Sequence, residues 1–261
     1  MKTALAQTNT VWEDKPTNQF KAEKFTSEAA EANCDLIVFP EMTLTGFSMN
    51  IDKMAEPEKE SQTISFFKRL AAKNKIYIMF NAALIDISGK IFNKTITVDN
   101  SGNIVSSYAK IHPYSHGVEA KYFTGGSNVE WFDLNGVTVS PFICYDMRFP
   151  EIFQIASEKS RLIVISASWP DFRSPQYDIL IRARAIENQS FIAAVNRVGH
   201  EMKYNYNGHS QIASPSGDVI TPILEDEALI IAEFDISEAE SCRHDFQVKS
   251  DRHPEIYKKY W

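Results

Sequence analysis

The sequence predicts an α/β protein in which mixed β-sheets carry helices on their outer faces. Strand and helix patterns alternate at both ends of the chain, and β-hairpin patterns occupy its middle. The hydrophobic content of 44% and the charged content of 23% are those of an ordinary globular protein. Because no Pro-rich, Gly-rich or low-complexity run divides the chain, we expect a single domain over residues 1–261.

The first predicted elements alternate in type. Strand patterns occur at residues 3–7, 36–39 and 76–82. The second and third of these are continuous apolar runs, which are typical of strands buried on both faces. Residues 17–33 and 61–73 instead repeat apolar side chains at helical spacing. We expect the first helix to turn Phe20, Phe25 and Ala29 toward the core.

Two hairpins are expected in the middle of the chain. Alternating residues at 91–98 and 104–108 flank a turn that contains Gly, and residues 129–132 and 137–143 flank an Asn-Gly turn. Separate strand and helix patterns then return. They fall at residues 162–166, 177–188, 191–196, 211–213, 219–220 and 228–234, of which only the second is helical.

Composition and charge exclude several classes of protein. A net charge of −7 leaves no basic surplus to neutralise phosphates, so we expect no nucleic-acid partner. The N-terminus lacks a long apolar stretch and no run of 18 apolar residues occurs, so we expect no signal peptide, no membrane association and a cytoplasmic location. The three cysteines are too scattered for a disulfide framework, and no His or Cys cluster has metal-binding spacing. We therefore expect neither a metal nor another cofactor.

Cys144 ends an apolar, strand-like run and precedes a charged turn and a helix start near Phe149-Pro150. This position suits a thiolate nucleophile, because a nearby cation or helix N-terminus lowers the pKa of a thiol. We expect Lys110 to supply the cation and the helix to supply the dipole. The alternative is a small buried hydrophobic residue, which is the role that we assign to Cys34 and Cys242.

Glu41 and Lys110 also follow buried strand patterns. A partly desolvated carboxylate has a raised pKa and suits general acid–base chemistry, whereas a solvated Glu41 would only cap a turn. A desolvated lysine beside a developing oxyanion would stabilise its charge, although most lysines lie on the surface. Together with Cys144, these residues form a candidate catalytic site in which each member stands at a strand end.

Three segments that contain these residues resemble the signature segments of the nitrilase, or carbon–nitrogen hydrolase, superfamily. They are Phe39–Glu41, Tyr108–His112 and Cys144–Glu151, and they occur in the family's chain order of Glu, Lys and Cys. Residues 182–189 and 206–217 are similar to later parts of the family pattern. The resemblance implies a four-layer α-β-β-α sandwich that commonly forms dimers, so we expect a homodimer.

The resemblance also implies a role for each residue of the site. Cys144 would be the nucleophile and Glu41 the general base. Lys110 and the backbone N–H of Tyr145 would stabilise the oxyanion. The family often has a second glutamate shortly after the lysine, and Glu119 matches it as a supporting active-site carboxylate. Such a site hydrolyses an amide through a cysteine thioester.

Two further segments, Ser168–Arg173 and Asn196–Gly199, resemble the bacterial ω-amidase branch of the family. That branch hydrolyses the terminal amide of substrates such as 2-oxoglutaramate and succinamate, whose free carboxylate suits an arginine. Arg148 and Arg173 are candidates for this contact, and each could instead form a structural ion pair. Trp169 could line the pocket or pack in the core.

Other functions stay open at this point. An amidase for deaminated glutathione shares the Cys144–Glu151 segment, and a true nitrilase fits this set of motifs less well. A non-catalytic interaction protein with the same fold is an alternative of a different class. The presence of Glu41, Lys110 and Cys144 counts against it, because a protein without catalytic activity would be free to lose these residues. Pro113-Tyr114 stands where many relatives carry Leu-Phe, which affects the expected shape of the pocket.

Overall fold

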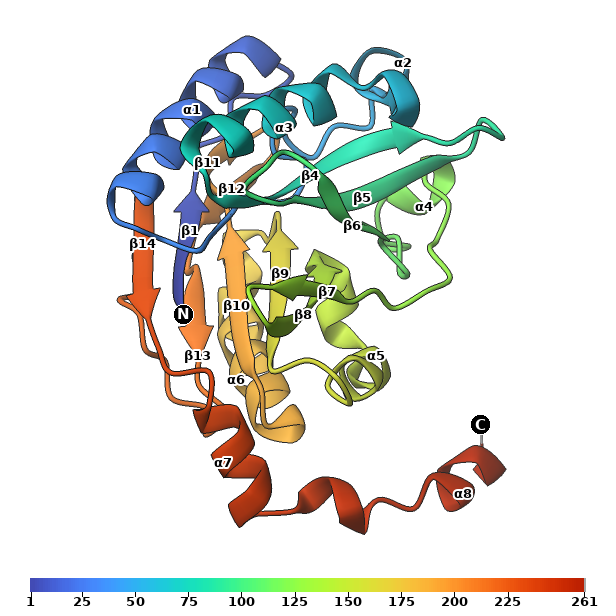
Figure 1. The fold of residues 1–261 in the computed structure, drawn as a ribbon. Helices are drawn as coiled ribbons and strands as arrows, with labels where there is room; N and C mark the ends of the chain where they lie inside the picture. Colours follow the sequence, from blue (N-terminus) through green and yellow to red (C-terminus); the bar gives the residue numbers. More distant parts are fainter. Residues whose placement is uncertain (261) are drawn as a thin grey trace.

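Two β-sheets face each other in the computed structural model, which describes residues 1–260, and helices cover their outer faces (Figure 1). The seven-stranded sheet contains β1 (Lys2–Gln7), β2 (Leu36–Val38), β3 (Glu56–Pro57), β4 (Tyr77–Ile85), β5 (Ile91–Val98), β6 (Ile104–Ala109) and β14 (Ala228–Glu233). The five-stranded sheet contains β7 (Phe132–Leu134), β8 (Val137–Ile143), β9 (Leu162–Ala167), β10 (Phe191–Asn196) and β13 (Gln211–Ala213). A separate hairpin contains β11 (Val198–Glu201) and β12 (Tyr204–Asn207).

The helices flank these sheets and also form a C-terminal arm that extends from the body (Figure 1). They are α1 (Lys15–Glu31), α2 (Ile51–Met54), α3 (Gln62–Asn74), α4 (Glu119–Tyr122), α5 (Pro150–Ala156), α6 (Ser174–Asn188), α7 (Glu238–Asp245) and α8 (Pro254–Tyr257). Short 3₁₀ helices lie at Glu58–Glu60, Cys144–Arg148, Asp171–Arg173, Val248–Asp251 and Lys258–Tyr260. Within residues 1–260, no helix combines the length and the apolar character needed to cross a bilayer.

Three hydrophobic cores separate four layers. The first core lies between the seven-stranded sheet and the helices α1 and α3, and it includes Phe25 and Phe67. The second lies between the two sheets, where Val38 of β2 and Val164 of β9 are fully buried. The third joins the five-stranded sheet to α5 and α6 and includes Tyr177. The expected four-layer α-β-β-α sandwich is therefore confirmed.

One detail of the predicted core is wrong. Phe20 of α1 is 70% exposed, whereas Ala22, Phe25 and Ala29 are buried. These three positions share one face of the helix, and Phe20 lies away from it. An apolar side chain at a surface position is common, so residue type alone did not identify the buried face.

The strand directions bring the three predicted site segments to one edge. β1, β2 and β4 are parallel, and β6 runs the same way as β4 because β5 is antiparallel to both. In the other sheet, β8, β9 and β10 are parallel. The N–H of Glu41 donates to the carbonyl of Ala167 at 3.4 Å, which joins the end of β2 to the end of β9. Side chains that follow β2, β6 and β8 therefore meet between the sheets.

Candidate active site

Glu41, Lys110, Glu119 and Cys144 come together at this edge. The Lys110 ammonium lies 2.7 Å from Oε1 of Glu41 and 2.9 Å from Oε2 of Glu119. The side chains of the two glutamates are 0% exposed and that of Lys110 is 1% exposed. The sequence prediction that these residues share a site is consistent with this geometry, and the ammonium takes the position between the carboxylates.

Cys144 stands at the junction between β8 and a 3₁₀ helix. Its φ angle is 45°, a left-handed conformation that is uncommon for a residue with a side chain. Such backbone strain persists only where the surroundings hold it in place, and it concentrates at functional sites. β8 ends at Ile143 and the 3₁₀ helix begins at Cys144, so the thiol lies at the point where the chain changes direction.

Asp146 braces this turn against the Lys110 segment, and the sequence analysis did not identify it. Its Oδ2 accepts hydrogen bonds from the Tyr108 hydroxyl at 2.7 Å and from the Ile143 N–H at 3.2 Å. Its Oδ1 accepts from the N–H of His112 at 3.0 Å. The available sequence signal was a charge three residues after the end of a buried strand, because a charge that becomes buried needs hydrogen-bond partners.

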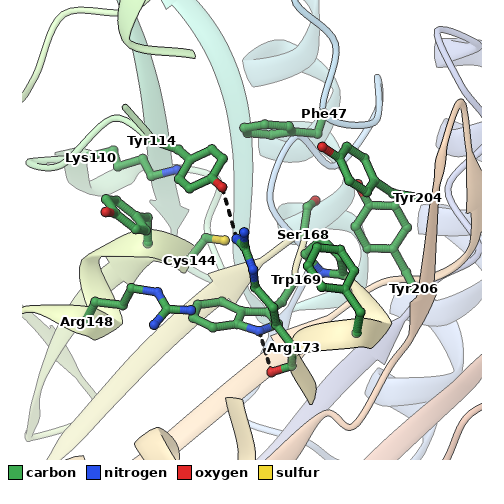
Figure 2. Close-up of a pocket in the computed structure, with 13 residues that line it drawn as sticks. Phe47, Lys110, Tyr114, Cys144, Arg148, Ser168, Trp169, Arg173, Tyr204 and Tyr206 are labelled. Atoms are coloured by element: carbon green, nitrogen blue, oxygen red, sulfur yellow. Dashed lines mark hydrogen bonds between the residues drawn. The ribbon is translucent and has the colours of Figure 1, made fainter. Parts of the chain in front are cut away.

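The thiol faces a pocket of about 560 Å³ that includes its open mouth (Figure 2). Its lining combines the site with aromatic side chains from several elements: Phe47, Lys110, Tyr114, Cys144, Tyr145, Arg148, Ser168, Trp169, Pro170, Phe172, Arg173, Tyr204 and Tyr206. Phe47, Tyr204 and Tyr206 were not predicted. The two tyrosines alternate along β12, a pattern that could have predicted this strand but not its place in the pocket.

Comparison with known proteins identifies the family. A model of the carbon–nitrogen hydrolase family matches residues 2–244. The chain belongs to this family. The resemblance found in its three sequence segments is therefore confirmed, and the chain is a hydrolase of carbon–nitrogen bonds.

Individual relatives support the family assignment over most of the length of the chain. The chain is 33% identical over 245 residues to the 2-oxoglutaramate amidase of Bacillus subtilis (strain 168). The aligned region covers 93% of this chain and 94% of the relative. The chain is also 30% identical over 220 residues to the omega-amidase YafV of Yersinia enterocolitica, with 84% and 83% coverage. The crystal structure of XC1258 from Xanthomonas campestris, a CN-hydrolase superfamily protein with an arsenic adduct in its active site, has a TM-score of 0.90, 27% identity and 97% coverage of each chain.

The electrostatics of the hydrolase site follow from burial and close charges. Burial raises the pKa of Glu41, the Lys110 charge opposes this, and the Glu119 charge adds to it, so the net pKa is raised as expected. Burial alone would lower the pKa of Lys110, but the charges of Glu119 and Glu41 outweigh it and raise this pKa. The two carboxylates therefore favour the ammonium form of Lys110.

The expected lowering of the Cys144 pKa is wrong. Burial raises the pKa of this thiol well above its ordinary value, the Glu41 charge raises it further, and the Lys110 charge opposes both without prevailing. α5 begins only at Pro150, after the 3₁₀ helix. The resting cysteine is thus a neutral thiol, and its attack on a substrate requires a base to remove the proton.

The two arginines of the hydrolase pocket have no carboxylate partner within 4.0 Å among residues 1–260. Arg148 lies 4.7 Å from the centre of the Trp169 ring and donates to Gln176 at 2.6 Å. Arg173 donates to the Tyr114 hydroxyl at 3.0 Å (Figure 2). The alternative of a structural ion pair is therefore not found for either residue.

Trp169 fills both roles that the sequence left open. Its ring lines the pocket, yet the residue is only 3% exposed and packs 5.5 Å from the ring centre of Tyr177. Its Nε1–H donates to the backbone carbonyl of Arg173 at 2.9 Å. The indole is thus a rigid wall that also holds the end of the 3₁₀ helix Asp171–Arg173.

Proposed function

We propose that this hydrolase cleaves the terminal amide of a small substrate that carries a free carboxylate, of the 2-oxoglutaramate or succinamate type, to give the acid and ammonia. The observation that carries the proposal is a cysteine thiol beside a buried Glu–Lys–Glu cluster, in a pocket whose wall presents two arginines that have no carboxylate partner among residues 1–260. A guanidinium that pairs with no protein carboxylate suits a substrate carboxylate, because it can bind that group through two parallel hydrogen bonds. The names of the two amidase relatives support the same substrate class.

In the proposed mechanism, Glu41 takes the proton from Cys144 and the sulfur attacks the amide carbonyl carbon. Lys110 and the backbone N–H of Tyr145 stabilise the resulting oxyanion. The intermediate collapses as Glu41 returns the proton to the departing nitrogen, which leaves as ammonia and leaves a thioester on Cys144. Glu41 then removes a proton from water as the water oxygen attacks the thioester. The carbon–sulfur bond breaks to release the acid, and Glu41 passes its proton to the departing sulfur, which restores the thiol.

Glu119 has a supporting role in this proposal. Its two oxygens accept from the Lys110 ammonium at 3.1 and 2.9 Å, and Oε2 also accepts from the N–H of Tyr114 at 2.7 Å. These contacts fix the ammonium beside the base. They also connect Glu119 to the pocket wall, since Tyr114 lines it.

Release of ammonia from 2-oxoglutaramate, succinamate and deaminated glutathione, measured side by side, tests the proposal. We expect turnover of the first two to exceed that of the third by a clear margin in kcat/KM. A preference for deaminated glutathione would replace the proposed substrate class, and no release from any of the three would favour another amide substrate or a non-catalytic role.

Replacing Arg173 with Gln should lower kcat/KM for succinamate by about 10–100-fold, because hydrogen bonds to a charged group are worth about 1.5–3 kcal/mol. Activity toward butyramide, which has no carboxylate, should change little. Arg69→Gln, at an exposed position of α3, is the matched control and should change neither value. An equal loss for both amides would show that Arg173 shapes the pocket without binding the carboxylate.

We also propose a single catalytic domain that forms a homodimer in the cytoplasm. Pairing of β1 with β14 joins the two ends of the family region and supports one domain. The three cysteines are free, which suits a reducing compartment. Ile155 of α5 and Ile179 and Ile186 of α6 are exposed at 52%, 67% and 52%, and such apolar side chains suit a contact with a second copy.

Light scattering after size exclusion tests the dimer. We expect the mass of two chains for the wild type and of one chain for Ile179→Glu, because a charge would be buried in the contact. Ile87→Glu, on the turn between β4 and β5, is a control at a still more exposed isoleucine and should stay dimeric. A monomeric wild type would contradict this proposal.

A further inference from the structure

Two buried asparagines, Asn93 and Asn81, connect to the two glutamates of the site. Nδ2 of Asn93 donates to Oε1 of Glu41 at 2.9 Å and to Oε1 of Glu119 at 2.8 Å. Oδ1 of Asn93 accepts from Nδ2 of Asn81 at 2.8 Å. All four side chains belong to residues that are 0% exposed, so solvent cannot replace these hydrogen bonds.

A backbone hydrogen bond fixes the orientation of the two side-chain amide groups. Oδ1 of Asn81 accepts a hydrogen bond from the N–H of Met42 at 2.6 Å. A backbone N–H can only donate, so Asn81 must present its oxygen to Met42 and its NH₂ group to Asn93. Asn93 must then turn its own NH₂ group toward the carboxylates. The hydrogen bonds therefore begin at the residue after Glu41 and return to the Glu41 side chain.

The two oxygens of Glu41 consequently have different surroundings. Oε1 accepts from Asn93 and from the Lys110 ammonium at 2.7 Å. Oε2 accepts only from the N–H of Ser168, at 3.1 Å, among residues 1–260. Because Oε1 already accepts two hydrogen bonds and Oε2 accepts one, Oε2 has more capacity left to accept the proton of the Cys144 thiol.

An amide side chain fits this place because its oxygen accepts from Asn81 and its NH₂ group donates to both glutamates. The cluster already holds two carboxylates and one ammonium, so a third carboxylate would add repulsion. A hydroxyl has a single donor and could not serve both glutamates, whereas an NH₂ group has two. We infer that Asn93, oriented by Asn81, is a positioning residue that holds Glu41 ionised with Oε2 directed to the Cys144 thiol.

The inference rests on the proposed function, and the pH dependence of succinamate hydrolysis tests it. Loss of a donor to the ionised form raises the pKa of a carboxylate, so the acid limb of kcat/KM should move to higher pH. For Asn93→Leu we expect a shift of about one pH unit and a fall in kcat of about 10–100-fold. KM should change little, because Asn93 does not line the pocket. Asn93→Asp should shift the limb in the same direction and further, because it adds a negative charge.

Two other variants separate positioning from general stability. Asn81→Leu should shift the acid limb in the same direction, and combining it with Asn93→Leu should add little, since both remove the same chain of contacts. Thr95→Val is the matched control: its hydroxyl accepts from Asn81 at 3.4 Å but contacts neither carboxylate. We expect its acid limb to match that of the wild type.

The rate at which chloroacetamide alkylates Cys144, located by mass spectrometry, gives a readout that does not need turnover. Its pH dependence should show the same upward shift in Asn93→Leu and Asn93→Asp. Folded variants whose alkylation and turnover profiles both match the wild type would overturn the inference. A wild type that hydrolyses no amide would instead contradict the proposed function, and the alkylation profiles would still test Asn93.

Discussion

Cys144→Ala should abolish amide hydrolysis, with a loss of kcat of at least about 10⁴-fold, because no other group can form the thioester. The variant should keep its fold, since the change removes one sulfur atom at a residue that is only partly buried in the pocket wall. Ammonia release at saturating succinamate, together with a thermal melt, measures both outcomes.

The other two cysteines provide the controls for this prediction. Cys34 is buried in the core under α1, and Cys242 lies on α7, away from the pocket. Cys34→Ala and Cys242→Ala should each retain kcat close to that of the wild type. If Cys144→Ala kept roughly a tenth of the wild-type rate, the nucleophile would have to be another group.

Lys110→Met should remove both catalysis and stability. The ammonium is the shared partner of Glu41 and Glu119, so its loss leaves two buried carboxylates facing each other. Breaking a buried charge pair in this way costs about 3–5 kcal/mol of unfolding free energy. Loss of an oxyanion donor adds a fall in kcat of about 10²–10³-fold. Denaturant unfolding and ammonia release give the two values.

The pH dependence of this destabilisation has a defined sign. Without the ammonium, the folded-state pKa of a glutamate in the cluster rises further above its unfolded value. Stability that comes from such a group is present at low pH and is lost as the pH rises through the folded-state pKa. The difference in unfolding free energy between Lys110→Met and the wild type should therefore be larger at pH 8 than at pH 5.

Lys94→Met is the matched control for Lys110→Met. Lys94 also contacts a glutamate, Glu58, at 2.8 Å, but these side chains are 14% and 29% exposed. A partly exposed ion pair contributes about 0–1 kcal/mol, so this variant should unfold close to the wild type. Equal destabilisation by the two changes would contradict a special role for the buried cluster.

Much of the fold was accessible from the sequence, because buried strands and amphipathic helices have distinct periodicities. The Asp99–Asn103 turn between β5 and β6 was predicted from its Gly-containing pattern and is confirmed. The predicted strand over 129–132 begins only at Phe132, and the helix expected from residue 17 begins at Lys15. Both differences lie at element ends, where local signals are weakest.

The position of the β11–β12 hairpin could not be predicted from the sequence. Its residues are mostly polar, and its stability comes from neighbours far away in the chain. Arg197, just before β11, is fully buried, donates to the carbonyl of Thr10 at 2.7 Å and pairs with Glu201. Glu201 in turn accepts from the N–H of Phe47 at 3.3 Å, which fixes another part of the pocket wall. No local pattern contains these contacts.

The sequence by itself determined the family, the layer order and the identities of the glutamate, lysine and cysteine, because each stands at the end of a short, strongly patterned strand. The tertiary structure alone decided how these groups affect one another. Whether Cys144 rests as a thiol or a thiolate depends on burial and on the balance between Glu41 and Lys110, which are distant in the chain. The roles of Asn93 and Asp146 likewise depend on contacts between residues that are distant in the chain. Hydrogen bonding and desolvation depend on distance in space and not on order in the sequence.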